Sequence, residues 1–366
     1  MTPQQHSRYA RHLLLPGFGE AAQQRLLQSK VLLIGAGGLG SPAALYLAAA
    51  GVGHLTIIDP DVVDLSNLQR QILHRQSDVG KPKVHSAQRE LHALNPDCQL
   101  SLLAEPFTAE NALTLATQHD LVIDGSDNFT TRFLSNDACY LTRTPLVYGS
   151  IFQFEGQVTL FDPQRQDSPC YRCIVPTSPA EGAVPNCLEA GVIGTLPGII
   201  GSLQAMEAIK YLTGIGEPPV GKLLYYDALH TSFRQIQIQP DPCCPLCSPT
   251  PSITTLSTES VAACSASTST TPSITSADLR DLLPQGIFLL DVREPDEYAL
   301  SRIPGSQLVP LSQLRNGQLP TLPTDRPLYI HCKAGSRSLQ AIQILKDAGY
   351  HDLINISDGI DGWLRL

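Results

Sequence analysis

The chain of 366 residues lacks a long hydrophobic run: no stretch approaches the roughly 20 apolar residues that span a bilayer. Residues 1–11 are polar and lack the apolar segment found in signal peptides. A basic excess is also absent, because the net charge is -9, so a nucleic-acid role has no electrostatic support. These absences argue against membrane-spanning and nucleic-acid-binding proteins. We expect a cytoplasmic protein with neither a membrane nor a nucleic acid as its partner.

The chain is too long for one average domain, and a low-complexity segment divides it in two. Residues 248–272 consist largely of Ser, Thr, Ala and Pro and carry a single charge, on Glu259. Such a segment cannot bury enough apolar surface to offset the entropy lost on ordering, so it predicts a flexible linker. We therefore expect an N-terminal domain at 1–247 and a C-terminal domain at 273–366.

Both domains alternate short apolar strands with helices, the pattern of an α/β fold. The elements expected in the first domain are strands at 31–34, 54–59, 121–124, 146–148, 157–161 and 222–226, and helices at 41–50 and 201–212. Those of the second are strands at 287–291 and 328–331 and a helix at 338–348. This order predicts a Rossmann-like, largely parallel sheet covered by helices, and a smaller α/β domain after the linker.

A glycine-rich loop joins the first expected strand to the first expected helix. Its pattern is Gly35-x-Gly37-x-x-Gly40, and Asp59 follows about 20 residues later. Glycines let the backbone approach phosphates, the helix N-terminus attracts negative charge, and the acid holds ribose hydroxyls. The loop alone leaves three interpretations open: a tight turn without a ligand, an NAD-dependent redox site, and a site for another nucleotide.

Charged residues near this loop favour a nucleotide that is attacked and cleaved. Arg70 closes the polar run at 66–70, Lys83 follows, and Asp127 lies just after a strand. When a carboxylate attacks the α-phosphate of ATP, pyrophosphate leaves, and its charge requires cations near the β- and γ-phosphates and a carboxylate that holds Mg²⁺. Each residue alone is more commonly part of a surface salt bridge. Their combination favours an adenylate-forming site over a redox site.

Several motifs together resemble those of the MoeB/ThiF family, which is related to ubiquitin-activating enzymes. They are Arg8-Tyr9-x-Arg11-His12, the glycine loop, Ser66-Asn67-Leu68-Gln69-Arg70-Gln71, Lys83 and Ser126-Asp127-Asn128. The resemblance covers nearly all of 1–247. It implies a homodimer that uses MgATP to adenylate the C-terminal glycine of a ubiquitin-like sulfur carrier ending in Gly-Gly.

The same resemblance implies which residues of this chain bind the nucleotide. The residues that match the family's MgATP site are Gly38, Asp59, Ser66, Asn67, Leu68, Gln69, Arg70, Lys83, Asp127 and Asn128, with Asp127 as the Mg²⁺ ligand. Arg11 would reach across the dimer to the phosphates bound by the partner.

Two cysteine pairs have the spacing of a metal site. Ten cysteines in a long intracellular chain favour metal binding or catalysis over disulfides. Cys170-x-x-Cys173 and Cys244-x-x-Cys247 suit a closed, structural Zn²⁺ site with four thiolates. Cys243 competes with Cys244, and the two-residue spacing favours Cys244. The pairs lie far apart in sequence, so they could be unrelated thiols; the family resemblance implies that they meet.

The remaining cysteines of the first domain and the linker have different expected roles. Cys187 follows a polar, proline-rich stretch at 177–185 that is typical of a mobile loop. A lone cysteine is usually a small buried side chain, but the family resemblance implies that Cys187 forms a covalent bond during sulfur transfer. We expect Cys98 and Cys139 to be packing residues. Cys264 lies in the linker and has no evident role.

The second domain contains a cysteine at the end of an expected strand, just before a helix. The segment is Ile330-His331-Cys332-Lys333-Ala334-Gly335-Ser336-Arg337-Ser338. Loop N–H groups, the helix dipole and Arg337 would stabilise an anion there and favour the nucleophilic thiolate of Cys332. The same geometry could serve a phosphatase, although the loop is short for one.

This segment resembles the loop of the rhodanese family, in which the cysteine carries sulfur as a persulfide. Supporting matches are Leu290-Asp291-Val292-Arg293-Glu294 to Tyr298, Ile303-Pro304-Gly305 and Asp358-Gly359-Ile360-x-x-Trp363. The resemblance spans 273–366 and implies sulfur transfer. A rhodanese fold without activity, which is common where the cysteine is missing, is the alternative.

The two resemblances together imply adenylation of a carrier followed by attack of a Cys332 persulfide, with Cys187 releasing the thiocarboxylate. The molybdopterin-synthase small subunit is the leading carrier, and a cysteine desulfurase or another donor supplies sulfur. Carriers for thiamine or cysteine biosynthesis or for tRNA thiolation remain open. So do a ubiquitin-like conjugating enzyme, a stand-alone thiosulfate sulfurtransferase and a non-enzymatic scaffold.

Overall fold

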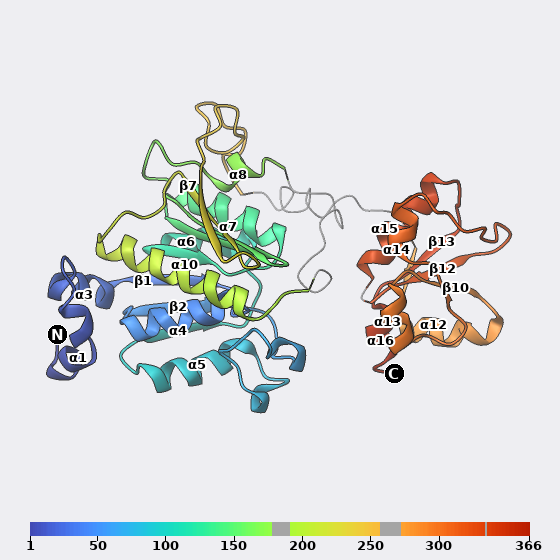
Figure 1. Ribbon diagram of the computed structural model, residues 1–366, viewed down its shortest axis with the longest axis horizontal. Coiled ribbons are helices and arrows are strands. Elements are labelled where there is room, and N and C mark those ends of the chain that lie inside the picture. The colour runs from blue at the N-terminus through green and yellow to red at the C-terminus, as the bar shows by residue number, and fades with distance from the viewer. Residues whose placement is uncertain (178–190, 257–271, 334) are drawn as a thin grey trace. The chain divides into compact units, whose positions relative to one another are not determined.

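The computed structural model describes residues 1–177, 191–256, 272–333 and 335–366, which form two compact units (Figure 1). The first unit contains the described residues up to 256, and the second those from 272 onwards. In these parts of the chain, no helix is both long and apolar enough to cross a membrane.

The first unit is built on an eight-stranded sheet with the order β3-β2-β1-β4-β5-β6-β7-β8. The strands are β1 (Lys30–Ile34), β2 (His54–Ile58), β3 (Gln99–Leu103), β4 (Leu121–Asp124), β5 (Leu146–Phe152), β6 (Glu155–Phe161), β7 (Lys222–Asp227) and β8 (Ser232–Gln237). The pairs from β3 to β5 are parallel, with Ile34 of β1 opposite Ile58 and Asp124. From β5 to β8 the pairs are antiparallel: β5–β6 and β7–β8 are hairpins, and β7 also pairs antiparallel with β6 although it lies far from β6 in the sequence.

Helices cover both faces of the parallel part, which explains its continuous apolar strands. The helices and 3₁₀ turns are α1 (Pro3–Arg8), α2 (Ala10–Leu13), α3 (Gly19–Gln28), α4 (Gly40–Ala50), η1 (Leu65–Asn67), η2 (Gln76–Asp78), α5 (Lys83–Leu94), α6 (Ala109–Thr117), α7 (Phe129–Thr142), α8 (Tyr171–Ile174) and α10 (Thr195–Thr213). Val31 and Leu33 face the core that contains α4 and α10, which lie side by side. Leu32 and Ile34 face the core of α6 and α7.

The second unit has a five-stranded, all-parallel sheet with the order β11-β10-β12-β13-β9. Its strands are β9 (Ser273–Ile274), β10 (Phe288–Asp291), β11 (Gln307–Leu308), β12 (Leu328–His331) and β13 (Leu353–Ile356). Its helices are α12 (Ser276–Leu282), η3 (Leu283–Gln285), α13 (Pro295–Leu300), α14 (Leu311–Arg315), α15 (Ser336–Asp347) and α16 (Gly359–Trp363). Two apolar cores flank this sheet: one includes Leu290 and Ile330, the other Leu289 and Ile356. The expected α/β fold class is confirmed for both units.

The start of the predicted linker packs on the first unit. The amide of Ile253 donates to Pro245 O at 2.8 Å, and Leu256 contacts the small core formed by α6 and α7. Residues 257–271, including Cys264, lie outside the described residues. The domain limits at 247 and 273 therefore stay a prediction.

Candidate active sites

A pocket of about 380 Å³ lies at the carboxyl ends of β1, β2 and β4. The strand order reverses here, because β2 and β3 lie on one side of β1 and β4 and β5 on the other. Ligands of open α/β sheets bind at such switch points. The lining residues are Ile34, Gly35, Gly37, Gly38, Leu39, Ile58, Asp59, Pro60, Asp61, Arg70, Gln71, Lys83, Pro106, Phe107, Gly125, Ser126, Asp127, Asn128, Thr131, Arg132 and Ile151.

The glycine loop turns sharply between β1 and α4. Gly35 has φ of +90°, a conformation that favours glycine, and its amide donates to Ile58 O at 2.8 Å. A Cβ on Gly40 would clash with Gly35 O, so the helix start lies directly against the loop. The loop therefore brings backbone N–H groups and a helix N-terminus to the edge of the pocket, the arrangement that binds phosphate.

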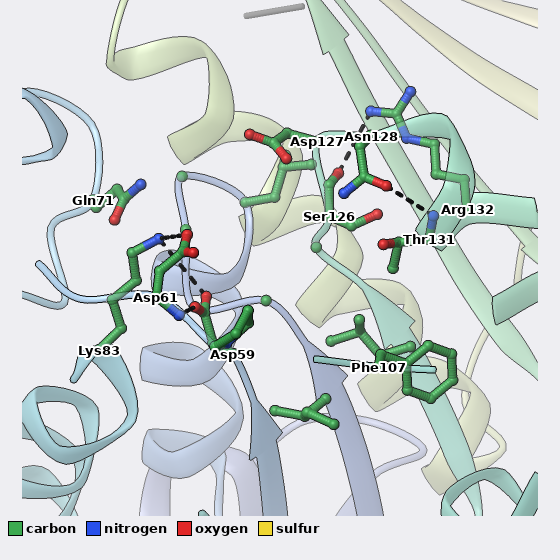
Figure 2. Close-up of a pocket in the computed structure, with 18 of the residues that line it drawn as sticks. Asp59, Asp61, Gln71, Lys83, Phe107, Ser126, Asp127, Asn128, Thr131 and Arg132 are labelled. Atoms are coloured by element: carbon green, nitrogen blue, oxygen red, sulfur yellow. Dashed lines mark hydrogen bonds and ion pairs between the residues drawn. The ribbon is translucent and has the colours of Figure 1, made fainter. Parts of the chain in front are cut away.

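Asp59, directly after β2, is fixed by two backbone amides. Its carboxylate accepts from Ala36 N at 2.7 Å and from Asp61 N at 2.8 Å, and Lys83 Nζ lies 3.8 Å away (Figure 2). Burial raises the pKa of Asp59, and Lys83 and the two amides offset part of this effect. A buried acid in this orientation can accept hydrogen bonds from the hydroxyls of a ribose.

Two cationic side chains also line the pocket. Lys83 is the first residue of α5, is 5% exposed, and places Nζ 2.8 Å from Asp61 Oδ2. Arg70 follows η1 and donates from Nη1 to Ser66 O at 3.1 Å. The pocket thus combines an acid suited to ribose with positive charges suited to phosphates.

The opposite side of the pocket is a hydrogen-bonded turn between β4 and α7 (Figure 2). The fully buried Asp124 carboxylate accepts from the backbone amide of Ser126 at 2.9 Å and from the hydroxyls of Ser126 and Ser135, both at 2.6 Å. Asn128 caps α7, because its Oδ1 accepts from Thr131 N at 2.8 Å. Asp127 lies between these two anchors and is exposed.

The structure brings six of the predicted nucleotide residues to one pocket: Gly38, Asp59, Arg70, Lys83, Asp127 and Asn128. Ser66, Asn67, Leu68 and Gln69 do not line it. They form η1 and the turn after it, and Asn67 Oδ1 accepts from Asp64 N at 3.1 Å. Arg11 is exposed on α2 and lies outside the pocket lining. Contact of these residues with MgATP stays a prediction.

Some pocket residues were not among the predicted site residues. Asp61 follows Asp59 by two positions, and Arg132 lies one helical turn after Asn128, where its guanidinium packs 5.6 Å from the Phe129 ring centroid. Gln71 is 5% exposed, and its Oε1 has no hydrogen-bond partner within the described parts of the chain. For Asp61 and Arg132, the only sequence signal was their short spacing from Asp59 and Asn128.

The four predicted zinc ligands form one cluster. The sulfur atoms of Cys170, Cys173, Cys244 and Cys247 all lie within 4.8 Å of one another. Tetrahedral zinc with bonds of about 2.3 Å places thiolate sulfurs about 3.8 Å apart, so the cluster fits such an ion. Cys243 is exposed and outside the cluster, which decides the alternative left open by the sequence.

Hydrogen bonds and an ion pair anchor the cysteine cluster to α7, the helix that follows Asp127. Tyr171 N donates to Asn136 Oδ1 of α7 at 2.7 Å. Arg172 forms a two-point ion pair with Asp137 of the same helix, at 2.7 and 2.6 Å. The cluster therefore helps to fix α7, whose N-terminal end borders the nucleotide pocket.

Other cysteines of the first unit lie in its cores or outside the described residues. Cys98 and Cys139 are 4% and 2% exposed, which confirms them as packing residues. Burial raises the pKa of Cys98 to about 11, so this thiol stays protonated at neutral pH. Cys187 lies at 178–190, outside the described residues, and its role stays a prediction.

Cys332 is fully buried between β12 and α15 in the second unit. Gly335 N donates to its Sγ at 3.1 Å, and the Ser338 hydroxyl lies 3.6 Å from it. Gly335 has φ of +90° and directs the chain into α15. This sulfur lies at the N-terminal end of a twelve-residue helix, where the dipole and a backbone amide favour negative charge.

Arg337, on the first turn of α15, forms a two-point ion pair with Glu297 of α13, at 2.6 and 2.8 Å. This pair holds the pKa of Glu297 below its usual value. It also fixes the helix start relative to α13. The expected contribution of Arg337 to thiolate stabilisation stays a prediction, and Ala334 lies outside the described residues.

A pocket suited to a nucleotide in one α/β unit, together with a cysteine at a helix N-terminus in a second unit of the same chain, fits one class of protein: a fused adenylyltransferase and sulfurtransferase. Comparison with protein families identifies the family of each domain. The ThiF family model matches residues 9–246, and the Rhodanese-like domain model matches 275–366. The chain belongs to the ThiF family and carries a rhodanese-like domain.

Named relatives support both activities. A Mycobacterium tuberculosis protein named probable adenylyltransferase/sulfurtransferase MoeZ is 44% identical, over 98% of this chain and 93% of that protein. A Zea mays adenylyltransferase and sulfurtransferase, MOCS3-1, is 39% identical over 98% of this chain and 81% of its own length. A Thermus thermophilus sulfur carrier protein adenylyltransferase is 48% identical over 68% of this chain and 93% of its own length.

Solved structures agree on the fold. The crystal structure of E. coli MccB has a TM-score of 0.60 at 22% identity and covers 67% of this chain and 73% of its own. The expectation of an adenylyltransferase and sulfurtransferase is confirmed by the families and the relatives. These matches argue against two alternatives left open by the sequence, an NAD-dependent redox enzyme and a non-enzymatic scaffold.

Proposed function

We propose that this protein adenylates the C-terminal glycine of a ubiquitin-like sulfur carrier and converts it into a thiocarboxylate. The molybdopterin-synthase small subunit is the preferred carrier, because fusion of these two domains is typical of that system. The observation that carries the proposal is the shared pocket of Asp59, Arg70 and Lys83, an acid suited to ribose beside cations suited to phosphates. Relatives named as sulfur carrier protein adenylyltransferase and MOCS3 support the choice of substrate.

In the first step, a carboxylate oxygen of the carrier terminus attacks the α-phosphorus of ATP. The bond to the oxygen that bridges the α- and β-phosphates breaks, and pyrophosphate leaves. Arg70 and Lys83 stabilise the charge on the leaving group, and Asp59 orients the ribose. The product is a mixed anhydride of the carrier and AMP.

Two metal ions complete the proposal. Asp127, exposed at the pocket, is the expected ligand of Mg²⁺, which neutralises phosphate charge when bound. The four-cysteine cluster is the expected site of a structural Zn²⁺ that stabilises the fold and takes no part in the reaction.

In the second step, the terminal sulfur of a Cys332 persulfide attacks the carbonyl carbon of the anhydride. A carbon–sulfur bond forms, the carbon–oxygen bond to AMP breaks, and an acyl disulfide remains. The Cys187 thiolate then attacks Cys332 Sγ, which releases the carrier thiocarboxylate and leaves a disulfide between the two cysteines for an external thiol to reduce. The presence of both domains in one chain would raise the effective concentration of the persulfide to the order of millimolar.

Further parts of the proposal concern assembly and sulfur supply. The protein acts as a homodimer in the cytoplasm, with Arg11 of one protomer reaching the phosphates bound by the other. A cysteine desulfurase or another donor loads Cys332. The exposed position of Arg11 on α2 leaves its side chain available for such a contact.

A second candidate is activation of a carrier for conjugation to protein lysines. A Haloferax volcanii relative named SAMP-activating enzyme E1 is 46% identical over 66% of this chain. In that case Cys187 would hold the carrier as a thioester. The rhodanese-like domain favours sulfur transfer, and mass spectrometry for carrier–lysine conjugates separates the two functions.

Pyrophosphate exchange tests the proposed function. The purified protein is offered a panel of carriers that end in Gly-Gly, and incorporation of labelled pyrophosphate into ATP is measured. We expect exchange with at least one carrier and none when the same carrier ends in an amide. With a sulfur donor present, that carrier should gain the mass expected for one oxygen replaced by sulfur. Equal exchange with and without every carrier would contradict the proposal.

A further inference from the structure

We propose that His74 is a positioning residue for adenylation: it holds the Ala36 peptide of the glycine loop and connects that loop to the helix that carries Lys83. His74 is outside the lining of the nucleotide pocket and 5% exposed. The inference deepens the adenylation proposed above and rests on it.

The Ala36 peptide groups are held on both sides. Ala36 N donates to Asp59 Oδ2 at 2.7 Å, and Ala36 O accepts from His74 Nε2 at 2.9 Å. Ala36 itself is fully buried, between Gly35 with φ of +90° and the pocket residue Gly37. Two glycines leave this part of the loop with little intrinsic rigidity, so these two hydrogen bonds fix the orientation of its peptides.

The other ring nitrogen of His74 connects the loop to α5. His74 Nδ1 lies 3.0 Å from Ser86 Oγ, and Ser86 lies on α5, less than one turn after Lys83. Ser86 Oγ is in turn 2.8 Å from Asp78 Oδ2, which Arg89 of the same helix binds at 2.6 Å. A continuous buried chain therefore joins the glycine loop to the helix whose first residue is the pocket lysine.

The hydrogen bonds show which ring nitrogen of His74 is the donor to the loop. Ala36 O can only accept, so Nε2 carries a proton. Burial lowers the pKa of His74, and Lys83 lowers it further, while Ala36 O, Asp59 and Asp78 raise it. Ser86 donates its single hydroxyl proton to Asp78 Oδ2 at 2.8 Å, and Asp78 also accepts from Arg89 and from Arg75 N at 3.0 Å. The hydrogen bond on which the inference rests is therefore the one from His74 Nε2 to Ala36 O.

Removal of the Nε2 donor has a predictable consequence. Ala36 O would be left buried without its partner, and the peptide could rotate to find another one. Such a rotation would turn the neighbouring N–H groups away from the phosphates and loosen Lys83 relative to the loop. Binding of ATP should weaken, and binding of the carrier should not.

A matched pair of variants separates positioning from general stability. His74→Gln keeps an N–H donor on the side chain, whereas His74→Leu removes it and remains apolar. In the full chain, we expect His74→Leu to weaken ATP affinity, measured by isothermal titration, and kcat/KM for ATP by about ten- to a hundredfold. His74→Gln should recover most of this loss, and the KM for the carrier should stay unchanged.

Further measurements keep the test decisive if His74→Leu folds poorly. Ser86→Ala should weaken ATP affinity by several-fold, and thiosulfate sulfurtransferase activity at Cys332 should be unaffected in every variant. Wild-type ATP affinity in His74→Leu, or losses in the Leu and Gln variants that simply follow their melting temperatures, would overturn the inference. Absence of carrier-dependent exchange in the wild type would instead refute the adenylation itself.

Discussion

Lys83 Nζ lies 2.8 Å from Asp61 Oδ2, and the two side chains differ sharply in exposure. The lysine side chain is 6% exposed and the aspartate side chain 64%. The ammonium is thus held at the pocket by a partner that remains well hydrated. Because a solvent-exposed partner contributes little net attraction, a phosphate oxygen can replace it at low cost.

This arrangement predicts that Lys83→Met lowers carrier-dependent pyrophosphate exchange by on the order of 10²-fold, since one fixed cation at the leaving group is lost. Exchange kinetics at saturating carrier measure the effect. Lys30→Met, which changes an exposed lysine at the start of β1, is the matched control and should leave the rate unchanged. Equal rates in both variants would remove Lys83 from the mechanism.

Asp127 is expected to hold the metal ion of the nucleotide. Asp127→Ala should abolish exchange while Cys332 still accepts sulfur from a donor, which mass spectrometry of the protein detects. Glu217→Ala removes an exposed carboxylate outside the pocket and should retain exchange. Undiminished exchange in Asp127→Ala would contradict the Mg²⁺ assignment.

A variant at Cys332 distinguishes adenylation from sulfur transfer experimentally. Cys332→Ala should eliminate the thiocarboxylate product, because no persulfide forms, and leave pyrophosphate exchange intact. The exposed Cys243, changed to Ala, is the matched control and should retain both activities. Loss of both activities in Cys332→Ala would show that the domains do not divide the work as proposed.

The four-cysteine cluster is expected to stabilise the first unit. Cys244→Ser should remove bound zinc and lower the melting temperature of that unit by about 10 °C, since a few kcal/mol shift a domain of this size by roughly that amount. Cys243→Ser should change neither. Metal analysis and calorimetry provide the readouts, and full zinc content in Cys244→Ser would refute the assignment.

The Arg337–Glu297 pair predicts a pH dependence of stability. The folded-state pKa of Glu297 is lowered, so the pair stabilises above the unfolded value of about 4.3 and the effect is lost as pH falls through the folded-state value. Glu297→Gln should therefore be less stable than the wild type at neutral pH, and the difference should shrink below about pH 4.

The single tryptophan, Trp363, makes this measurement specific to the second unit, because it lies on α16. Urea unfolding followed by its fluorescence gives the free energy of unfolding at each pH. Asp296→Asn changes an exposed neighbour on α13 and is the control. A constant difference between wild type and Glu297→Gln from pH 7 to pH 3 would contradict the ion pair's role.

The local features of the nucleotide site could be predicted from sequence. β1, the glycine loop and Asp59 follow from a buried apolar run and a fixed spacing, and both properties act over a few residues. The antiparallel half of the sheet was less evident, since the β5–β6 hairpin depends on a tight turn in which Gln153 adopts φ of 52°.

Local sequence features could not predict the position of residues that depend on contacts between distant parts of the chain. The family resemblance implies that residues 66–69 bind the nucleotide; in the structure they form the turn that presents Arg70 to the pocket, and their contact with the nucleotide stays a prediction. His74 carries no local signal, because its role appears only when the loop, η2 and α5 are packed together. The cysteine pairs are 74 residues apart, and the packing of the chain alone brings them together.

The most direct measurement follows the oxygen atoms of the carrier terminus. A carrier labelled with heavy oxygen in its C-terminal carboxylate is incubated with the full chain, ATP and a sulfur donor, and the released AMP is analysed by mass spectrometry. Attack of the carboxylate on the α-phosphorus, followed by displacement at the carbonyl carbon, predicts one labelled oxygen in AMP for each thiocarboxylate formed. Unlabelled AMP would mean that water, and not the carrier, attacks the nucleotide, and would contradict the account.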